Sequence, residues 1–235
     1  MKKLLIASTS TVHGKAYLEY LLPELKIFFK DVETILFIPF ARPSGLTHDE
    51  YTEKVRCVFE SIDKKVEGLH TFNDPKGALK NAKGIFVGGG NTFVLLAELY
   101  RRDILETLFQ VVDKGTPYFG TSAGSNIAGV TMMNTNDMPI MYPPSFVTLG
   151  LICFNLNPHY LDPDPNSTHM GETRETRIKE FHAFNHTPVL GLREGSWLAV
   201  EGEKVTLKGP LTARLFRENQ GPIELESGTD LSDLK

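Results

Sequence analysis

The chain has 235 residues, 41% of them hydrophobic, which is enough for one packed core. Its 25 basic and 29 acidic residues give a net charge of -4, and neither sign forms a run of five or six. This pattern argues against nucleic acid or an anionic membrane as a partner. No stretch approaches the roughly 18 apolar residues of a membrane-spanning helix, so we expect a soluble protein.

The cysteines and the N-terminal segment indicate the cellular compartment in which the protein is expected. Cys57 and Cys153 have no partner cysteine at metal-ligand spacing. The first apolar run, residues 4–7, is too short for a secretory signal, and we interpret it as a strand. We therefore expect two buried free thiols and a cytoplasmic protein.

Short apolar runs alternate with amphipathic segments through the first 130 residues. This alternation is typical of βαβ units, in which helices cover a parallel sheet. A capping box at Thr47 and Glu50 predicts a helix that extends to about Ser61, and a second helical pattern runs from Phe93 to about Asp113 with a break near Arg102. The expected strands are residues 4–8, 34–40, 66–72, 84–87 and 117–120.

The pattern changes beyond residue 185. Short alternating runs separated by turn residues predict antiparallel strands or hairpins added to the parallel core. These runs are residues 189–192, 197–200, 204–207 and 213–216. Because we find no repeat, linker or boundary, we expect a single α/β domain over residues 1–235.

One short motif, G-T-S-A-G at residues 120–124, points to a nucleophile. It follows a predicted strand and precedes small residues that suit a helix. In such an elbow the serine lies on a sharp turn that glycines permit, and the following helix offers free N–H groups. Ser122 is therefore the candidate nucleophile, and the N–H of Ala123 a candidate oxyanion donor.

A second turn, G-G-G-N-T-F at residues 88–93, has the same strand-to-helix position. Phe93 stands where a dinucleotide-binding fingerprint needs glycine, and no P-loop occurs, so nucleotide binding is disfavoured. A backbone N–H of Gly89 or Gly90 would supply the second oxyanion donor. The alternative is a turn that only lets strand and helix pack closely.

A nucleophilic serine needs a base, and histidine has a suitable pKa. His159 ends an apolar run and follows Pro158, so its spacing favours it over His13, which follows the first strand. Glu194, after an apolar strand, and Asp137, in a polar loop, are both candidates for the acid that orients the imidazole.

Six motifs resemble, in order, those of the peptidase E family of α-aspartyl dipeptidases. These are VGGGNTF, GTSAGSN, TNDMPI, NPHY, GETRETRI and GLREGSW, and the resemblance covers nearly the whole chain. It implies a three-layer α/β sandwich with a mostly parallel central sheet, similar to flavodoxin and the class I glutamine amidotransferases, plus C-terminal antiparallel strands. Two positions depart from the family pattern: Thr121 replaces a tryptophan and Arg193 a proline, which bears on pocket shape rather than on the chemistry.

The resemblance also implies roles for individual residues. The nucleophile and base fall on Ser122 and His159, and the oxyanion donors fall on the N–H groups of Gly90 and Ala123. The third triad member falls on either Glu194 or Asp137, and we favour Glu194 because the end of a core strand is rigid. Arg174 matches the family arginine to which binding of the substrate carboxylate is assigned. Alternatively, Arg174 and Arg177 form surface ion pairs with Glu172 and Glu175.

We therefore expect a cytoplasmic serine dipeptidase that hydrolyses Asp-X dipeptides through an acyl-enzyme and needs no metal or cofactor. One alternative is a cyanophycinase-like hydrolase of β-aspartyl bonds. Another is a non-catalytic small-molecule-binding module on the same fold. The sequence leaves open whether the protein is a monomer or a homodimer.

Overall fold

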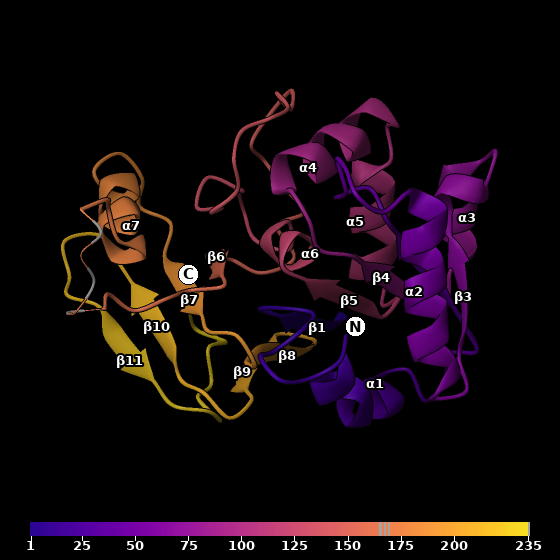
Figure 1. The fold of residues 1–235 in the computed structure, drawn as a ribbon, viewed down its shortest axis with the longest axis horizontal. Coiled ribbons are helices and arrows are strands. Elements are labelled where there is room, and N and C mark those ends of the chain that lie inside the picture. The colour runs from indigo at the N-terminus through magenta and orange to yellow at the C-terminus, as the bar shows by residue number, and fades with distance from the viewer. Residues whose placement is uncertain (165, 167, 169, 235) are drawn as a thin grey trace.

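The computed structural model describes residues 1–164, 166, 168 and 170–234. Within this part, eleven strands form two sheets, and helices flank them (Figure 1). The smaller sheet and α7 lie on the left of the view, and the larger sheet with its helices on the right. No described helix has the length and apolar character needed to cross a membrane.

The larger sheet has seven strands in the order β3-β2-β4-β5-β1-β8-β9. The first five are parallel, and β8 and β9 are antiparallel to their neighbours, as the changed pattern of the C-terminal segment predicts. The strands are β1 (Lys3–Ala7), β2 (Thr34–Ile38), β3 (Lys65–Gly68), β4 (Ile85–Val87), β5 (Tyr118–Thr121), β8 (Trp197–Glu201) and β9 (Lys204–Lys208).

Helices cover both faces of this sheet and make the expected three layers. Alternate residues of β1 face opposite sides, so Leu5 packs with the first group of helices and Ile6 with the second. The first group is η1 (Glu19–Leu21), α1 (Leu22–Phe28) and α2 (His48–Glu60). The second is α3 (Pro75–Asn81), α4 (Thr92–Arg101), α5 (Leu105–Asp113) and α6 (Ala123–Asn126).

The smaller sheet has the order β11-β10-β7-β6, with β6 and β7 parallel and the other pairs antiparallel. Its strands are β6 (Asn155–Pro158), β7 (Val189–Leu192), β10 (Ala213–Phe216) and β11 (Ile223–Leu225). The helix α7 (Arg174–His182) packs on it through Ile178. The sequence predicted β7 and β10 but not the separate sheet in which β7 lies between β10 and β6, because pairing between distant segments leaves no local pattern.

Several local predictions agree with the structure. The capping box at Thr47 and Glu50 begins α2, and the helical pattern of residues 93–113 is interrupted after Arg101, where α4 ends. The expected strand at 66–72 is shorter, because residues 69–71 form the 3-10 helix η2.

The expectation of buried thiols is wrong, since Cys57 and Cys153 are free but exposed. On α2, Val55 and Phe59 occupy the buried positions on either side of Cys57. In the loop before β6, Ile152 and Phe154 do the same for Cys153.

Candidate active site

Four strand ends bring the predicted site residues together. Ser122 directly follows β5, and the glycines 88–90 follow β4. His159 follows β6, and Glu194 comes two residues after β7. Because β4 and β5, and likewise β6 and β7, are parallel neighbours, their carboxyl ends lie at matching edges of their sheets, where loops bind ligands.

Close packing explains the G-T-S-A-G turn. Ser122 has a φ of 52° and a ψ of -109°, an uncommon backbone conformation for a residue other than glycine. A Cβ on Gly124 would lie 2.2 Å from the carbonyl oxygen of Val87, and one on Gly120 would lie 2.6 Å from that of Gly124. The two glycines therefore let α6 begin directly against β4 and β5, and Ser122 stands at the turn between strand and helix.

Hydrogen bonds connect Ser122, His159 and Glu194 in one line. The distance from Ser122 Oγ to His159 Nε2 is 2.9 Å. On the other side of the ring, His159 Nδ1 lies 2.6 Å from Glu194 Oε1. An Nδ1–H that donates to the carboxylate leaves Nε2 free to accept the serine proton, which is the arrangement of a nucleophile, a base and an orienting acid.

Ser8, at the end of β1, ties the two sheets together beneath this line. The buried Ser8 hydroxyl accepts from the N–H of His159 at 2.9 Å and donates to the carbonyl of Leu192 at 2.7 Å. These two hydrogen bonds hold the backbone of His159, where φ is 56°, next to β7, the strand that leads to Glu194. Ser8 was not among the predicted residues: its position after the first strand marks a strand end, but nothing local in the sequence indicates its distant partners.

The glycine turn lies against the elbow. A Cβ on Gly89 would be 3.1 Å from Ser122 Cβ, so the two turns approach to van der Waals contact. Gly90 has a φ of 147°, and a Cβ there would lie 2.2 Å from the carbonyl oxygen of Ala41. Among the described residues, the N–H groups of Gly90 and Ala123 donate to no protein acceptor, which leaves both available to a bound oxygen.

Asp137 lies elsewhere in the site. Its Oδ2 accepts from the N–H of Thr92 at 2.6 Å and from the hydroxyl of Thr135 at 3.0 Å, so it caps the start of α4. It makes no hydrogen bond to His159. Of the two candidate acids, the structure brings Glu194 to the imidazole.

The loop that contains Asp137 nevertheless reaches His159 through its neighbour. Asn136 Nδ2 donates to the carbonyl of Pro158 at 2.8 Å, directly before His159. Asn136 was not among the predicted residues, and its place beside Asp137 in the T-N-D-M-P-I motif was the only signal for it.

Arg174 begins α7 and lines a cavity of about 480 Å³ together with Asp162, Glu172 and Arg177. Burial and the nearby charge of Arg177 lower the pKa of Arg174, whereas the charge of Asp137 raises it. Among the described residues, Arg177 pairs with Glu172 at 3.7 Å, but no carboxylate lies within salt-bridge distance of Arg174. Arg174 is thus a partly buried cation that can still bind an anion.

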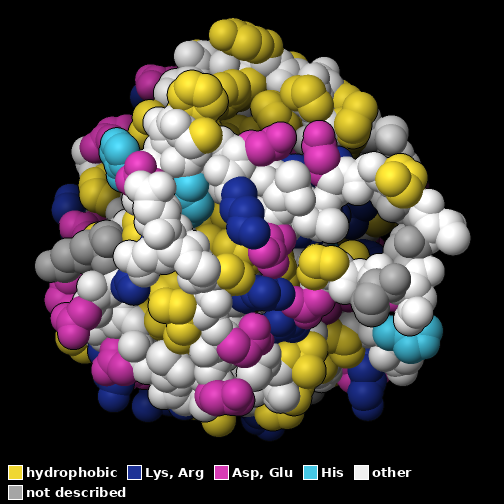
Figure 2. All heavy atoms as spheres, turned by 90° about the vertical axis from the view of Figure 1, so that its left-hand side faces the viewer, with side chains coloured by type: hydrophobic (Ala, Val, Ile, Leu, Met, Phe, Trp, Pro, Cys, Tyr) yellow, Lys and Arg dark blue, Asp and Glu magenta, His cyan; other side chains and the backbone are white. Residues whose placement is uncertain are grey.

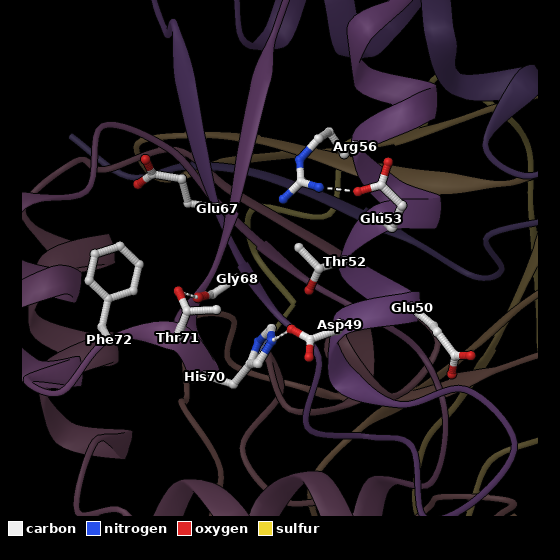
Figure 3. Close-up of a pocket in the computed structure, with 10 residues that line it drawn as sticks. All are labelled: Asp49, Glu50, Thr52, Glu53, Arg56, Glu67, Gly68, His70, Thr71 and Phe72. Atoms are coloured by element: carbon white, nitrogen blue, oxygen red, sulfur yellow. Dashed lines mark hydrogen bonds and ion pairs between the residues drawn. The ribbon is translucent and has the colours of Figure 1, made fainter.

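A separate cavity of about 470 Å³ lies between α2 and η2 (Figure 3). Within it His70 Nε2 lies 2.8 Å from Asp49 Oδ1, and Arg56 pairs with Glu53. None of the predicted site residues lines this cavity. The alternative base, His13, is exposed and makes no described contact with Ser122.

Comparisons with known proteins find similarity along almost the whole chain. The family described as "Peptidase family S51" matches residues 4–208 of the chain. The chain is 51% identical to "Peptidase E" of Streptomyces coelicolor over 98% of its own length and 94% of that protein. It is 48% identical to "Probable alpha-aspartyl dipeptidase" of Drosophila melanogaster over 99% and 97% of the two chains.

A solved structure supports the fold. The crystal structure of a peptidase from an acI-B1 Actinobacterium superposes with a TM-score of 0.74 at 15% identity, covering 98% of this chain and 96% of that one.

Proposed function

The chain belongs to peptidase family S51, a family of serine peptidases, and from this membership we propose that it hydrolyses dipeptides with an N-terminal aspartate. The observation that carries the proposal is the line of hydrogen bonds from Ser122 Oγ through His159 to Glu194. The name of the Drosophila melanogaster relative, "Probable alpha-aspartyl dipeptidase", supplies the substrate class.

In the acylation step, His159 Nε2 takes the proton of Ser122 as Oγ attacks the carbonyl carbon of the Asp-X peptide bond. The N–H groups of Gly90 and Ala123 stabilise the oxyanion that forms. The protonated imidazole then gives its proton to the leaving nitrogen, and the C–N bond breaks. The second amino acid departs and leaves an aspartyl ester on Ser122.

In the second half of the reaction, water replaces the amine. His159 takes a proton from this water, and the hydroxide attacks the ester carbonyl. When the tetrahedral intermediate collapses, His159 returns the proton to Ser122 Oγ, and free aspartate leaves. Arg174 binds the side-chain carboxylate of the substrate aspartate, for which its planar guanidinium offers two parallel donors.

Glu194 is the third triad member in this proposal. Support comes from its 2.6 Å contact with His159 Nδ1, whereas the hydrogen bonds of Asp137 are to Thr92 and Thr135. Asp137 holds the glycine turn instead, because it caps the helix that follows Gly90 and Asn91.

The test is a panel of Asp-Leu, its β-aspartyl isomer and Asn-Leu. We expect cleavage of Asp-Leu, with kcat reduced by about 10⁴-fold or more in Ser122→Ala and unchanged in Ser44→Ala, an exposed loop serine. Cleavage of the β-aspartyl isomer alone would favour the cyanophycinase-like alternative. Failure to cleave any member would favour a non-catalytic binding module.

The proposal includes a cytoplasmic, single-domain enzyme. The two cysteines are free, and the smaller sheet shares a hydrophobic core with the larger one through residues such as Leu190 and Leu215. Cell fractionation and a single cooperative unfolding transition are the corresponding measurements.

A further inference from the structure

Five charged side chains cluster behind the His159–Glu194 pair, and we call them the Arg193 cluster. Figure 2 shows side chains of both charges close together across this face of the molecule. The members are Arg193, Asp162, Glu224, Arg214 and Glu175.

Arg193 lies at the centre of this cluster. It follows β7 and directly precedes Glu194. Its Nε and Nη2 donate to the two oxygens of Asp162 at 2.8 and 2.9 Å, a bidentate pair, and its other donors reach Thr212 and Glu224. The guanidinium also lies 5.7 Å from the ring centre of Tyr160, the residue after His159.

The same cluster reaches the candidate substrate-binding helix. Asp162 Oδ1 also accepts from Arg214 Nη1 at 3.1 Å, and Arg214 Nη2 lies 3.3 Å from Glu175 Oε2. Glu175 directly follows Arg174 in the first turn of α7. Three ion pairs in series therefore connect the residue before Glu194 with the residue after Arg174.

Three of the five side chains are mostly buried, whereas Asp162 and Glu224 are each 44% exposed. The side chains of Arg193, Glu175 and Arg214 are 16%, 18% and 25% exposed. Exposed single pairs contribute little, but a bidentate arginine and a carboxylate shared by two cations fix geometry. Asp162 also lines the same cavity as Arg174, so the cluster forms part of the wall beside the free cation.

The two ends of the connection are held with different strength. Glu194 follows β7, which is paired with β6 and β10 and is tied to Ser8 at its last residue. The first turn of α7 follows a segment without helix or strand in its described residues, while the buried contact of the helix, Ile178, lies one turn later. Loss of the connection would therefore release Arg174 before Glu194.

We propose that the Arg193 cluster positions Arg174 relative to the catalytic residues and so determines selectivity for the aspartyl carboxylate. The inference rests on the proposed function for its choice of substrate. Asp162 and Arg214 are positioning residues in this proposal, because they act through Arg174. Their removal weakens binding of the carboxylate and leaves the Ser122–His159–Glu194 line intact.

The test compares Asp162→Asn and Arg214→Gln with Asp103→Asn. Asp103 forms an ion pair with Lys76 outside the Arg193 cluster, so Asp103→Asn is a matched control for the loss of one carboxylate. We expect KM for Asp-Leu to rise about 10-fold in each cluster variant with kcat changed less than about 3-fold, and the preference for Asp-Leu over Asn-Leu to fall. The double variant should be little worse than either single one, because both break the same connection.

A second measurement does not depend on activity. Hydrogen exchange should speed up at residues 174–178 in Asp162→Asn and stay unchanged at 189–192. An unchanged KM, or a fall in kcat alone, would overturn the proposal. Unchanged exchange at α7 would also overturn it, even if the wild-type protein cleaved no Asp-X dipeptide, so failure of the proposed function stays distinguishable.

Discussion

The turns after β4 and β5 hold their functional groups by different means from the ends of β6 and β7. The first pair is built from backbone, with glycines packed so closely that a Cβ on Gly124 would lie 2.2 Å from a carbonyl oxygen. The second pair is built from side chains, where Ser8, His159 and Glu194 come from three distant parts of the chain. We call the turns after β4 and β5 the backbone half of the site and the ends of β6 and β7 the side-chain half. The backbone half requires that its glycines carry no Cβ, whereas the side-chain half requires specific polar side chains.

Apart from changes of the nucleophile Ser122 itself, this difference predicts that single polar changes act most strongly on the side-chain half. Glu194→Gln should lower kcat by about 10²–10⁴-fold, because an amide no longer stabilises the imidazolium or fixes its tautomer. Asp137→Asn is the matched change on the loop and should cost less than about 10-fold. Steady-state kinetics on Asp-Leu decides between them, and a larger loss at Asp137 would contradict Glu194 as the orienting acid.

In the backbone half, the change expected to lower stability most is the addition of one methyl group to a closely packed glycine. Gly124→Ala should reduce the free energy of unfolding by about 1–3 kcal/mol, since the new Cβ would overlap the carbonyl of Val87. Gly221→Ala is the control, because a Cβ there has no atom within 4 Å. Urea unfolding that gave equal values for both variants would mean that the elbow is not tightly packed.

Ser8 tests how the two halves are joined. Ser8→Ala should lower the free energy of unfolding by about 1–2 kcal/mol, because the partly buried N–H of His159 loses its acceptor. We expect kcat to fall several-fold as His159 loses orientation. Ser10→Ala, at a hydroxyl without a hydrogen bond to another described residue, should change neither quantity in the same unfolding and kinetic measurements.

The smallest effect concerns pH. Arg193 and Arg214 lower the pKa of Asp162, so its contribution to stability is complete above the unfolded-state pKa of about 4 and is lost as pH falls through the lower folded-state pKa. Since Asp162 is 44% exposed, the contribution should stay below about 1 kcal/mol. Unfolding free energies measured from pH 5 downward should fall less steeply in Asp162→Asn, and parallel slopes would refute this.

The same contrast explains what could be predicted from the sequence. Ser122, Ala123 and a donor at Gly89 or Gly90 could be proposed because the backbone half lies in two short motifs whose glycine spacing reflects local sterics, and the family resemblance narrowed the donor to Gly90. His159 and Glu194 were proposed as residues at strand ends, and Glu194 was preferred to Asp137 for its rigid position. The distance of 2.6 Å from Glu194 to His159 Nδ1 supports that preference. Ser8 and the Arg193 cluster were missed because their contacts join segments up to 184 residues apart, which no local pattern records.

The positive φ of 52° at Ser122 also restricts which nucleophiles this fold can carry. A β-branched side chain is strongly disfavoured at positive φ, so a threonine in place of Ser122 would introduce conformational strain. Cysteine keeps an unbranched Cβ and the same backbone requirements as serine. Cysteine is therefore compatible with this backbone and threonine is not, so Ser122→Thr should unfold at lower urea concentration than Ser122→Cys.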